Sequence, residues 1–200
     1  MSGSPHLLRP RLLMVDNADS FTFRLVDYLR DLGAAVRVAR SDAINIAEAL
    51  NAEIDGVVIS PGPGRAEDSG ASVAIAAACI GVHRPLLGVC LGHQAIALAC
   101  GGVIERTAPV HGKVSQVRHD GTGLFPTLPS PFGATRYHSL AVAEPAAPLI
   151  ANAWSEDGVV MGVRHIEAPA HGMQFHPESV ASEAGKPLLA AFLDVVRNAP

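Results

Sequence analysis

The sequence has few cysteines, no run of basic residues and no hydrophobic stretch long enough to span a bilayer. Its three cysteines follow neither a disulfide framework nor a zinc-site spacing, so we expect a reduced, cytoplasmic protein without a metal site. The net charge of −4 and the missing basic runs argue against nucleic acid as a partner. The absence of a hydrophobic stretch of that length argues against a membrane as a partner.

Residues 1–10 also lack the apolar core of a signal peptide, and we expect them to form a disordered N-terminal extension. We expect residues 11–200 to form one domain, because a chain of 200 residues with 48% hydrophobic content can bury a full core. We find no internal repeat and no low-complexity linker that would divide it.

Strands and helices alternate in the first half of the chain. The expected strands are 11–15, 35–39, 55–59 and 85–89, and the expected helices are 21–32, 44–50, 71–80 and 94–99. This alternation predicts an α/β fold with an open, mostly parallel sheet flanked by helices. Ligands bind such sheets at the carboxyl ends of the strands, which here carry Asp16, the loop 60–64 and Cys90.

The pattern changes after Gly102. Alternation in 103–117, a strand-like run that begins at 136–140, and the pair 159–165 and 172–175 are typical of antiparallel strands. The sequence therefore predicts an antiparallel extension of the sheet, which a last helix, 186–197, closes.

The segment 85–102 (PLLGVCLGHQAIALACGG) contains the most distinctive motif. Cys90 lies between an apolar strand and a helix, with a glycine two residues away on each side, as in a nucleophile elbow. The N-terminus of a helix favours a thiolate and can hold an oxyanion. A cysteine in this position can also be a small buried hydrophobe, and that is our interpretation of Cys79 and Cys100.

Two further motifs follow strands. The loop 60–64 (SPGPG) has the composition of an ordinary turn, yet its prolines and glycines can expose backbone N–H groups to an oxyanion. His176 and Glu178 would face one site if the segment is extended, and a carboxylate beside an imidazole selects its tautomer. Such a pair could also be half of a metal site, but no further ligand lies at a suitable spacing.

Taken together, the segments 60–64 (SPGPG), 88–94 (GVCLGHQ) and 174–179 (QFHPES) closely resemble those of the class I, triad-type glutamine amidotransferases. The resemblance covers residues 11–196 and implies their fold, a flavodoxin-like α/β sheet with an antiparallel extension.

Three more segments narrow the resemblance. The segments 16–22 (DNADSFT), 111–113 (HGK) and 137–140 (YHSL) are similar to those of the glutaminase subunit, component II, of anthranilate synthase and of aminodeoxychorismate synthase.

The resemblance implies a role for each matching position. Cys90 corresponds to the nucleophile, His176 to the general base and acid, and Glu178 to the carboxylate that orients it. The backbone oxyanion donors correspond to Gly62 and Leu91. The positions that correspond to those holding the glutamine substrate are Gly62, Pro63, Gly64, Gln94, Ser139 and Leu140.

The resemblance also implies partners. We expect L-glutamine as substrate and a chorismate-binding synthase subunit, component I, as acceptor of the ammonia, for anthranilate (tryptophan) or 4-amino-4-deoxychorismate (folate) synthesis. No cofactor is expected in this chain, whereas the synthase subunit is expected to need Mg²⁺. A stand-alone cysteine hydrolase of γ-glutamyl amides and a non-catalytic regulatory protein on the same scaffold are the alternatives.

The sequence departs from the family pattern at three positions. Ala18 replaces a tyrosine or larger residue, Arg24 replaces a common asparagine, and Ala66 replaces a common proline. None of the three belongs to the triad. The first two lie in a stretch expected near the partner subunit, so they affect the details of that interface.

Overall fold

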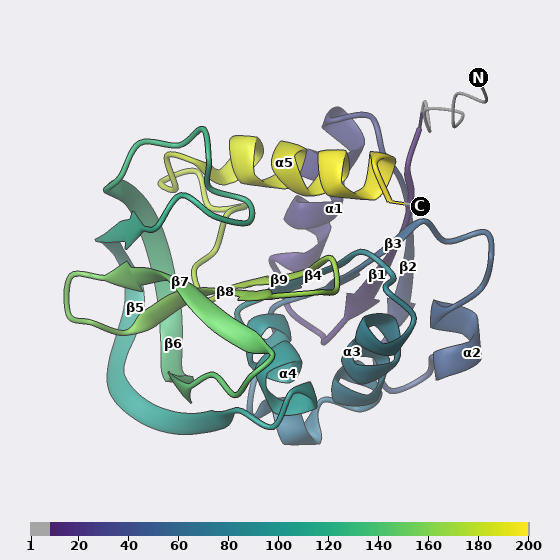
Figure 1. Ribbon diagram of the computed structural model, residues 1–200, viewed down its shortest axis with the longest axis horizontal. Coiled ribbons are helices and arrows are strands. Elements are labelled where there is room, and N and C mark those ends of the chain that lie inside the picture. The colour runs from purple at the N-terminus through teal and green to yellow at the C-terminus, as the bar shows by residue number, and fades with distance from the viewer. Residues whose placement is uncertain (1–8, 200) are drawn as a thin grey trace.

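The computed structural model describes residues 9–199 (Figure 1). The expectation for residues 1–10 falls mainly on residues 1–8, which lie outside the described residues. The strands are β1 Arg11–Asp16, β2 Ala35–Arg40, β3 Gly56–Ile59, β4 Leu86–Val89, β5 Val103–His119, β6 Phe132–Glu144, β7 Leu149–Ser155, β8 Val160–His165 and β9 Ala170–Met173. The helices are α1 Thr22–Asp31, α2 Ile46–Ala49, the 3₁₀ turn Ala66–Asp68, α3 Ser72–Gly81, α4 Leu91–Ala99 and α5 Gly185–Arg197.

Within residues 9–199, nine strands form one mixed sheet in the order β2-β1-β3-β4-β9-β8-β7-β5-β6. The strands β2, β1, β3, β4 and β9 pair in parallel, in the flavodoxin-like order 2-1-3-4-5. The strands β8, β7, β5 and β6 continue the sheet through antiparallel pairs. This arrangement confirms the predicted fold class.

Helices cover both faces of the sheet. The helices α1 and α5 lie together on one face, and α3 and α4 lie on the other (Figure 1). The central strands β3 and β4 are buried along their whole length, as expected for parallel strands covered on both sides. Of the helices in the described part of the chain, none is both long and apolar enough to cross a membrane.

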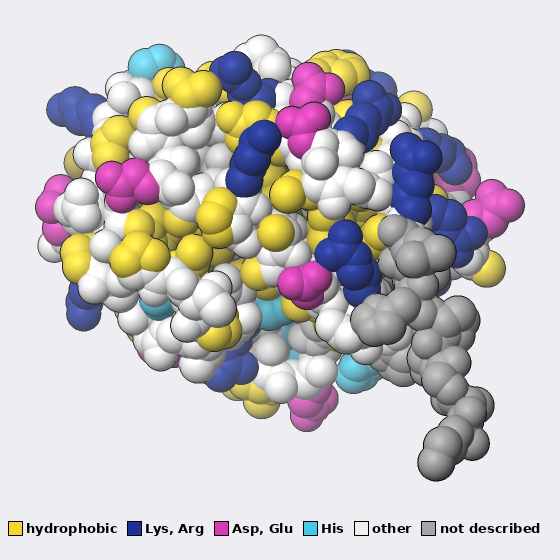
Figure 2. All heavy atoms as spheres, turned by 90° about the horizontal axis from the view of Figure 1, so that it is seen from above, with side chains coloured by type: hydrophobic (Ala, Val, Ile, Leu, Met, Phe, Trp, Pro, Cys, Tyr) yellow, Lys and Arg dark blue, Asp and Glu magenta, His cyan; other side chains and the backbone are white. Residues whose placement is uncertain are grey.

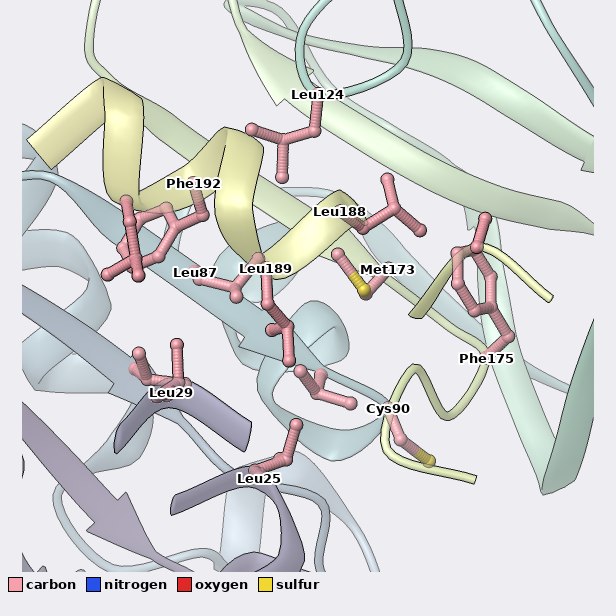
Figure 3. Close-up of a cluster of buried hydrophobic side chains, with 14 of the residues drawn as sticks. Leu25, Leu29, Leu87, Cys90, Leu124, Met173, Phe175, Leu188, Leu189 and Phe192 are labelled. Carbon is pink, nitrogen blue, oxygen red and sulfur yellow. The ribbon is translucent and has the colours of Figure 1, made fainter. Parts of the chain in front are cut away.

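The core between α5 and the sheet is built from side chains that recur at helical spacing. Most of the labelled side chains in Figure 3 come from α1, β4, β9 and α5, and they are joined by Leu124 from the loop after β5 and Phe175 from the segment after β9. The sulfur of Cys90 points away from the others at the edge of the cluster. Leu188, Leu189 and Phe192 are fully buried. Each buried side chain of this size contributes about 1.5–3 kcal/mol to folding. On the face seen in Figure 2, acidic and basic side chains are interspersed.

Several element boundaries differ from the sequence prediction. The helix α4 begins at Leu91 rather than at 94, directly after Cys90, and α2 spans only Ile46–Ala49. The strand β7, Leu149–Ser155, was not predicted from the sequence. The region 103–117 forms a single strand, β5, whose register with β6 shifts at three places, as in β-bulges.

The first prediction concerns the close packing of α4 against β3. A Cβ atom on Gly92 would lie 2.2 Å from the carbonyl oxygen of Ile59, so the backbone would have to move. We expect Gly92→Ala to lower the free energy of unfolding by about 3 kcal/mol or more. In the matched helical control Gly81→Ala, no atom lies within 4 Å of the new Cβ, and we expect no loss or a gain of up to ~1 kcal/mol. Urea denaturation measures both, and equal effects would contradict the packing argument.

Candidate active site

Cys90 lies on a strained turn between β4 and α4. Its backbone has φ 52° and ψ −102°, a conformation that residues other than glycine rarely adopt. A Cβ on Gly88 would lie 2.3 Å from the carbonyl oxygen of Gly92, so the turn requires glycine at this position. The N–H of Cys90 donates to the carbonyl of Met173 (2.8 Å), which anchors the turn to β9. The predicted nucleophile elbow is therefore present.

The parallel pairing of β4 and β9 brings His176 to Cys90. Val89 and Met173 are directly opposed, so the chain leaves both strands at the same edge of the sheet. His176 follows three residues after Met173, and its N–H donates to the carbonyl of Thr135 in β6 (2.9 Å). Two segments that are distant in the sequence thus meet beside the elbow.

The segment after His176 is a turn, so the prediction of an extended backbone was wrong. The N–H of Ser179 donates to the carbonyl of His176 (3.2 Å), with Pro177 at the turn position that its fixed φ favours. Glu178 still reaches the imidazole, because the tight turn folds its side chain back. Its Oε1 lies 2.6 Å from Nδ1 of His176.

The His176–Glu178 pair is buried. Burial lowers the pKa of His176, but the neighbouring Cys90 and the Glu178 carboxylate outweigh it and raise the pKa to about 10. Nε2 of His176 and Oε2 of Glu178 are buried without a hydrogen-bond partner within the described residues. Because Nδ1 faces the carboxylate, Nε2 is the ring nitrogen left for a substrate atom or for the thiol.

A cavity of about 190 Å³ opens beside the sulfur of Cys90. It is smaller than the roughly 300–1,000 Å³ of pockets for drug-sized ligands, and so suits a molecule the size of an amino acid. Cys90 and every position expected to hold the oxyanion or the glutamine line it: Gly62, Pro63, Gly64, Leu91, Gln94, Ser139 and Leu140. The cavity wall also includes Tyr137 and His138.

Asn17 holds the loop 60–64 over this cavity. Its N–H donates to Oγ of Ser60 (2.9 Å) and its Nδ2 donates to the Ser60 carbonyl (3.1 Å), while Ser72 donates to its Oδ1 (2.8 Å). A Cβ on Gly62 would lie 2.6 Å from Cβ of Asn17, so the loop backbone is pressed against this side chain. Across the cavity, the N–H of Leu91 belongs to the first turn of α4 and has no intrahelical acceptor.

Sequence reasoning did not assign a role to Gln174, which contacts the nucleophile. Its Nε2 lies 3.6 Å from Sγ of Cys90, and its Oε1 accepts from Nε2 of Gln94 (3.1 Å). Gln94 also donates to the carbonyl of Leu140 (3.0 Å). The signal for Gln174 was its place two residues before His176 in the motif 174–179.

Two aromatic rings pack against the imidazole of His176. The ring centroids of Phe21 and Tyr137 lie 5.4 and 5.2 Å from that of His176, both in edge-to-face geometry. Phe21 lies in the segment 16–22, between Ala18 and Arg24, two positions at which the sequence departs from the family pattern. Ala18 in that segment has φ 61°, and Ala66 is the buried first residue of the 3₁₀ turn beside α4.

The other cysteines lie away from this site. Cys79 is buried in α3, where burial raises the pKa of its thiol to about 12. Cys100 is half-buried at the end of α4, and burial raises the pKa of its thiol as well. Within residues 9–199, no group of three or more histidine, cysteine, aspartate or glutamate side chains is placed to hold a metal ion.

Comparisons with known proteins agree with this geometry. Residues 13–196 match the family described as glutamine amidotransferase class-I. The chain is 50% identical over 188 residues to anthranilate synthase component 2 of Thermus thermophilus, with 92% of each chain covered. It is 46% identical over 185 residues to aminodeoxychorismate synthase component 2 of Escherichia coli, with 91% of this chain and 98% of that protein covered. The crystal structure of a glutamine amidotransferase from Thermotoga maritima shares the fold, with a TM-score of 0.79 at 16% identity over 96% of this chain and 99% of that one.

The second prediction concerns the charge of His176. The pKa of His176 is about 10 in the folded state and near 6.5 when unfolded, so its protonation stabilises the fold fully below pH 6.5. That contribution is lost as the pH rises from 6.5 to 10. Glu178→Gln removes the carboxylate that raises this pKa, so we expect its free energy of unfolding to fall less steeply than the wild-type value over this range.

Urea denaturation at pH 6.5, 8 and 9.5 measures the effect. Glu67→Gln is the control, because Glu67 lies on the surface and its pKa is lowered from 4.5, so it does not titrate in this range. If the Glu178→Gln curve runs parallel to that of the wild type, the carboxylate does not hold the proton on His176.

Proposed function

The chain belongs to the class-I glutamine amidotransferase family, and we propose that it hydrolyses L-glutamine and supplies the ammonia to a chorismate-using synthase subunit. The observation that carries this proposal is the cavity beside Cys90. It unites the elbow, both oxyanion positions and every position expected to hold glutamine, next to the His176–Glu178 pair.

The first half of the reaction forms a thioester. The thiolate of Cys90 attacks the side-chain carboxamide carbon of glutamine, and the negative charge moves to the carboxamide oxygen. The N–H groups of Gly62 and Leu91 stabilise this oxyanion, an effect of about 3–4 kcal/mol for one donor. When the C–N bond breaks, its electrons leave with nitrogen, and His176 donates the proton from Nε2 that releases ammonia.

The second half regenerates the enzyme. Neutral His176 accepts a proton from water at Nε2, and the hydroxide that forms attacks the thioester carbon. The C–S bond breaks, glutamate leaves, and Cys90 returns to the thiolate while His176 is again protonated. Glu178 keeps Nδ1–H directed at itself and so leaves Nε2 as the nitrogen that exchanges protons.

The ammonia needs an acceptor on another polypeptide. The relatives that match over most of their length are named as component 2, which implies a second component. We propose that this partner binds chorismate and forms anthranilate or 4-amino-4-deoxychorismate. On this proposal any Mg²⁺ requirement belongs to the partner.

The third prediction tests the nucleophile. In the complex with the synthase subunit, we expect Cys90→Ser to lower glutamine-dependent product formation by about 10³-fold or more. The same variant should form product at the wild-type rate when an ammonium salt replaces glutamine, because only ammonia supply is lost. Product formation from chorismate, resolved by chromatography, measures both and identifies the product.

The matched control is Cys100→Ser, which changes a half-buried cysteine outside the cavity and should leave the glutamine-dependent rate within about twofold. Continued hydrolysis of glutamine by Cys90→Ser would refute the assigned nucleophile. If the isolated wild-type chain hydrolyses glutamine rapidly and supplies no ammonia to a synthase subunit, the result would favour the stand-alone hydrolase.

A further inference from the structure

Arg136 is the largest fully buried side chain in the described part of the protein. It lies in β6, directly before the segment 137–140 that lines the cavity beside Cys90. A buried guanidinium is costly unless it is paired and hydrogen-bonded. The triad and the proposed glutamine contacts do not use this residue, so its burial at this place needs another explanation.

The guanidinium is paired on one side with Asp157, in the turn between β7 and β8. Nη1 of Arg136 donates to both carboxylate oxygens of Asp157, at 3.0 and 3.1 Å, and to Oγ of Ser115 at 3.2 Å. Burial raises the pKa of Asp157, but its hydrogen bond with Ser155 and the charge of Arg136 outweigh burial, and the net pKa is lowered. The carboxylate is therefore ionised at neutral pH, and it fixes the position of the guanidinium.

On its other side, Arg136 selects the tautomer of His138. Nε of Arg136 lies 3.1 Å from Nε2 of His138, and because a guanidinium only donates, Nε2 must accept. The remaining proton is then on Nδ1, which donates to the carbonyl of Leu140 (3.1 Å). Burial and the charge of Arg136 lower the pKa of His138 to about 4, so the ring is neutral at neutral pH.

The Leu140 carbonyl connects this chain of bonds to the reacting centre. It accepts a second hydrogen bond, from Nε2 of Gln94 (3.0 Å), and Gln94 also donates to Gln174, which contacts the sulfur of Cys90. Two donors on one carbonyl fix the orientation of its peptide plane. These two hydrogen bonds therefore fix Ser139 and Leu140, which form part of the cavity wall.

We propose that Asp157, Arg136 and His138 act as a positioning relay that fixes the Ser139–Leu140 backbone and Gln94 in the geometry that binds glutamine. The inference rests on the proposed function. Asp157 and Arg136 do not line the cavity, so they are positioning residues. The relay acts on substrate binding, because none of its three members bonds directly to the thiol, its imidazole or the oxyanion donors.

The fourth prediction tests the relay with Asp157→Asn, which keeps the shape of a half-exposed side chain and removes its charge. We expect the KM for glutamine to rise about fivefold, the equivalent of one hydrogen bond, with kcat unchanged within about twofold. The assay is ammonia release from glutamine by the complex with the synthase subunit. The alkylation rate of Cys90 by iodoacetamide should stay at the wild-type value.

The matched control is Asp31→Asn, which breaks the exposed ion pair with Lys186 on the helical face and should leave KM unchanged.

A second pair of variants tests the donor at His138. His138→Leu removes both hydrogen bonds, whereas His138→Asn keeps an N–H near the position of Nδ1. We expect KM to rise in both and to be closer to the wild-type value in His138→Asn.

An unchanged KM in Asp157→Asn, with only a lower Tm, would make the Asp157–Arg136 pair purely structural and overturn the proposal. Equal KM values for the two His138 variants would also overturn it. Calorimetric binding of L-glutamine to Cys90→Ser, with and without Asp157→Asn, gives an answer that does not need catalysis. Weaker binding in the double variant supports the relay even if the wild-type complex releases no ammonia. A wild-type complex that releases no ammonia would refute only the proposed function.

Discussion

The site depends on how closely the N-terminus of α4 approaches the ends of β3 and β4. Gly88 and Gly92 allow this approach, since a Cβ on either would overlap backbone atoms. Cys90, between them, takes a positive φ that costs of order 1–3 kcal/mol. This turn directs the sulfur away from the buried side chains (Figure 3). Cys90 there lines the cavity. A relaxed turn would return Cys90 to the role of a small core residue.

Much of this arrangement could be predicted from local sequence. Apolar strands bounded by glycine and proline, helical spacing in α1 and α5, and the glycines around Cys90 are signals carried by neighbouring residues. The turn at Pro177 was predicted as extended, because the pattern did not reveal that Ser179 bonds back to the carbonyl of His176. The strand β7 was not predicted from the sequence. It forms a hairpin with the next strand, β8, and its far end pairs with β5, which is distant in the sequence.

The hydrogen bonds around the cavity wall could not be predicted from local sequence, because they join residues that are distant in the chain. Gln94 and Gln174 are separated by 80 residues, and Arg136 and Asp157 by 21. Each side chain, considered alone in the sequence, is an ordinary polar residue. The parallel pairing of β4 with β9 brings Gln94 and Gln174 together, and the pairing of β5 with both β6 and β7 brings Arg136 to Asp157. The hydrogen-bond chemistry is local, but the partners are chosen by topology.

These features also explain how the protein tolerates a costly site. Strain at Cys90, a buried imidazole–carboxyl pair at His176 and Glu178, and a buried guanidinium at Arg136 all lie near one edge of the sheet. Each would destabilise a small isolated hairpin. Here they adjoin the parallel half, whose central strands are wholly buried beneath helices on both faces. Because this apolar layer supplies the folding free energy, the polar edge can be fixed for binding and proton transfer rather than for stability.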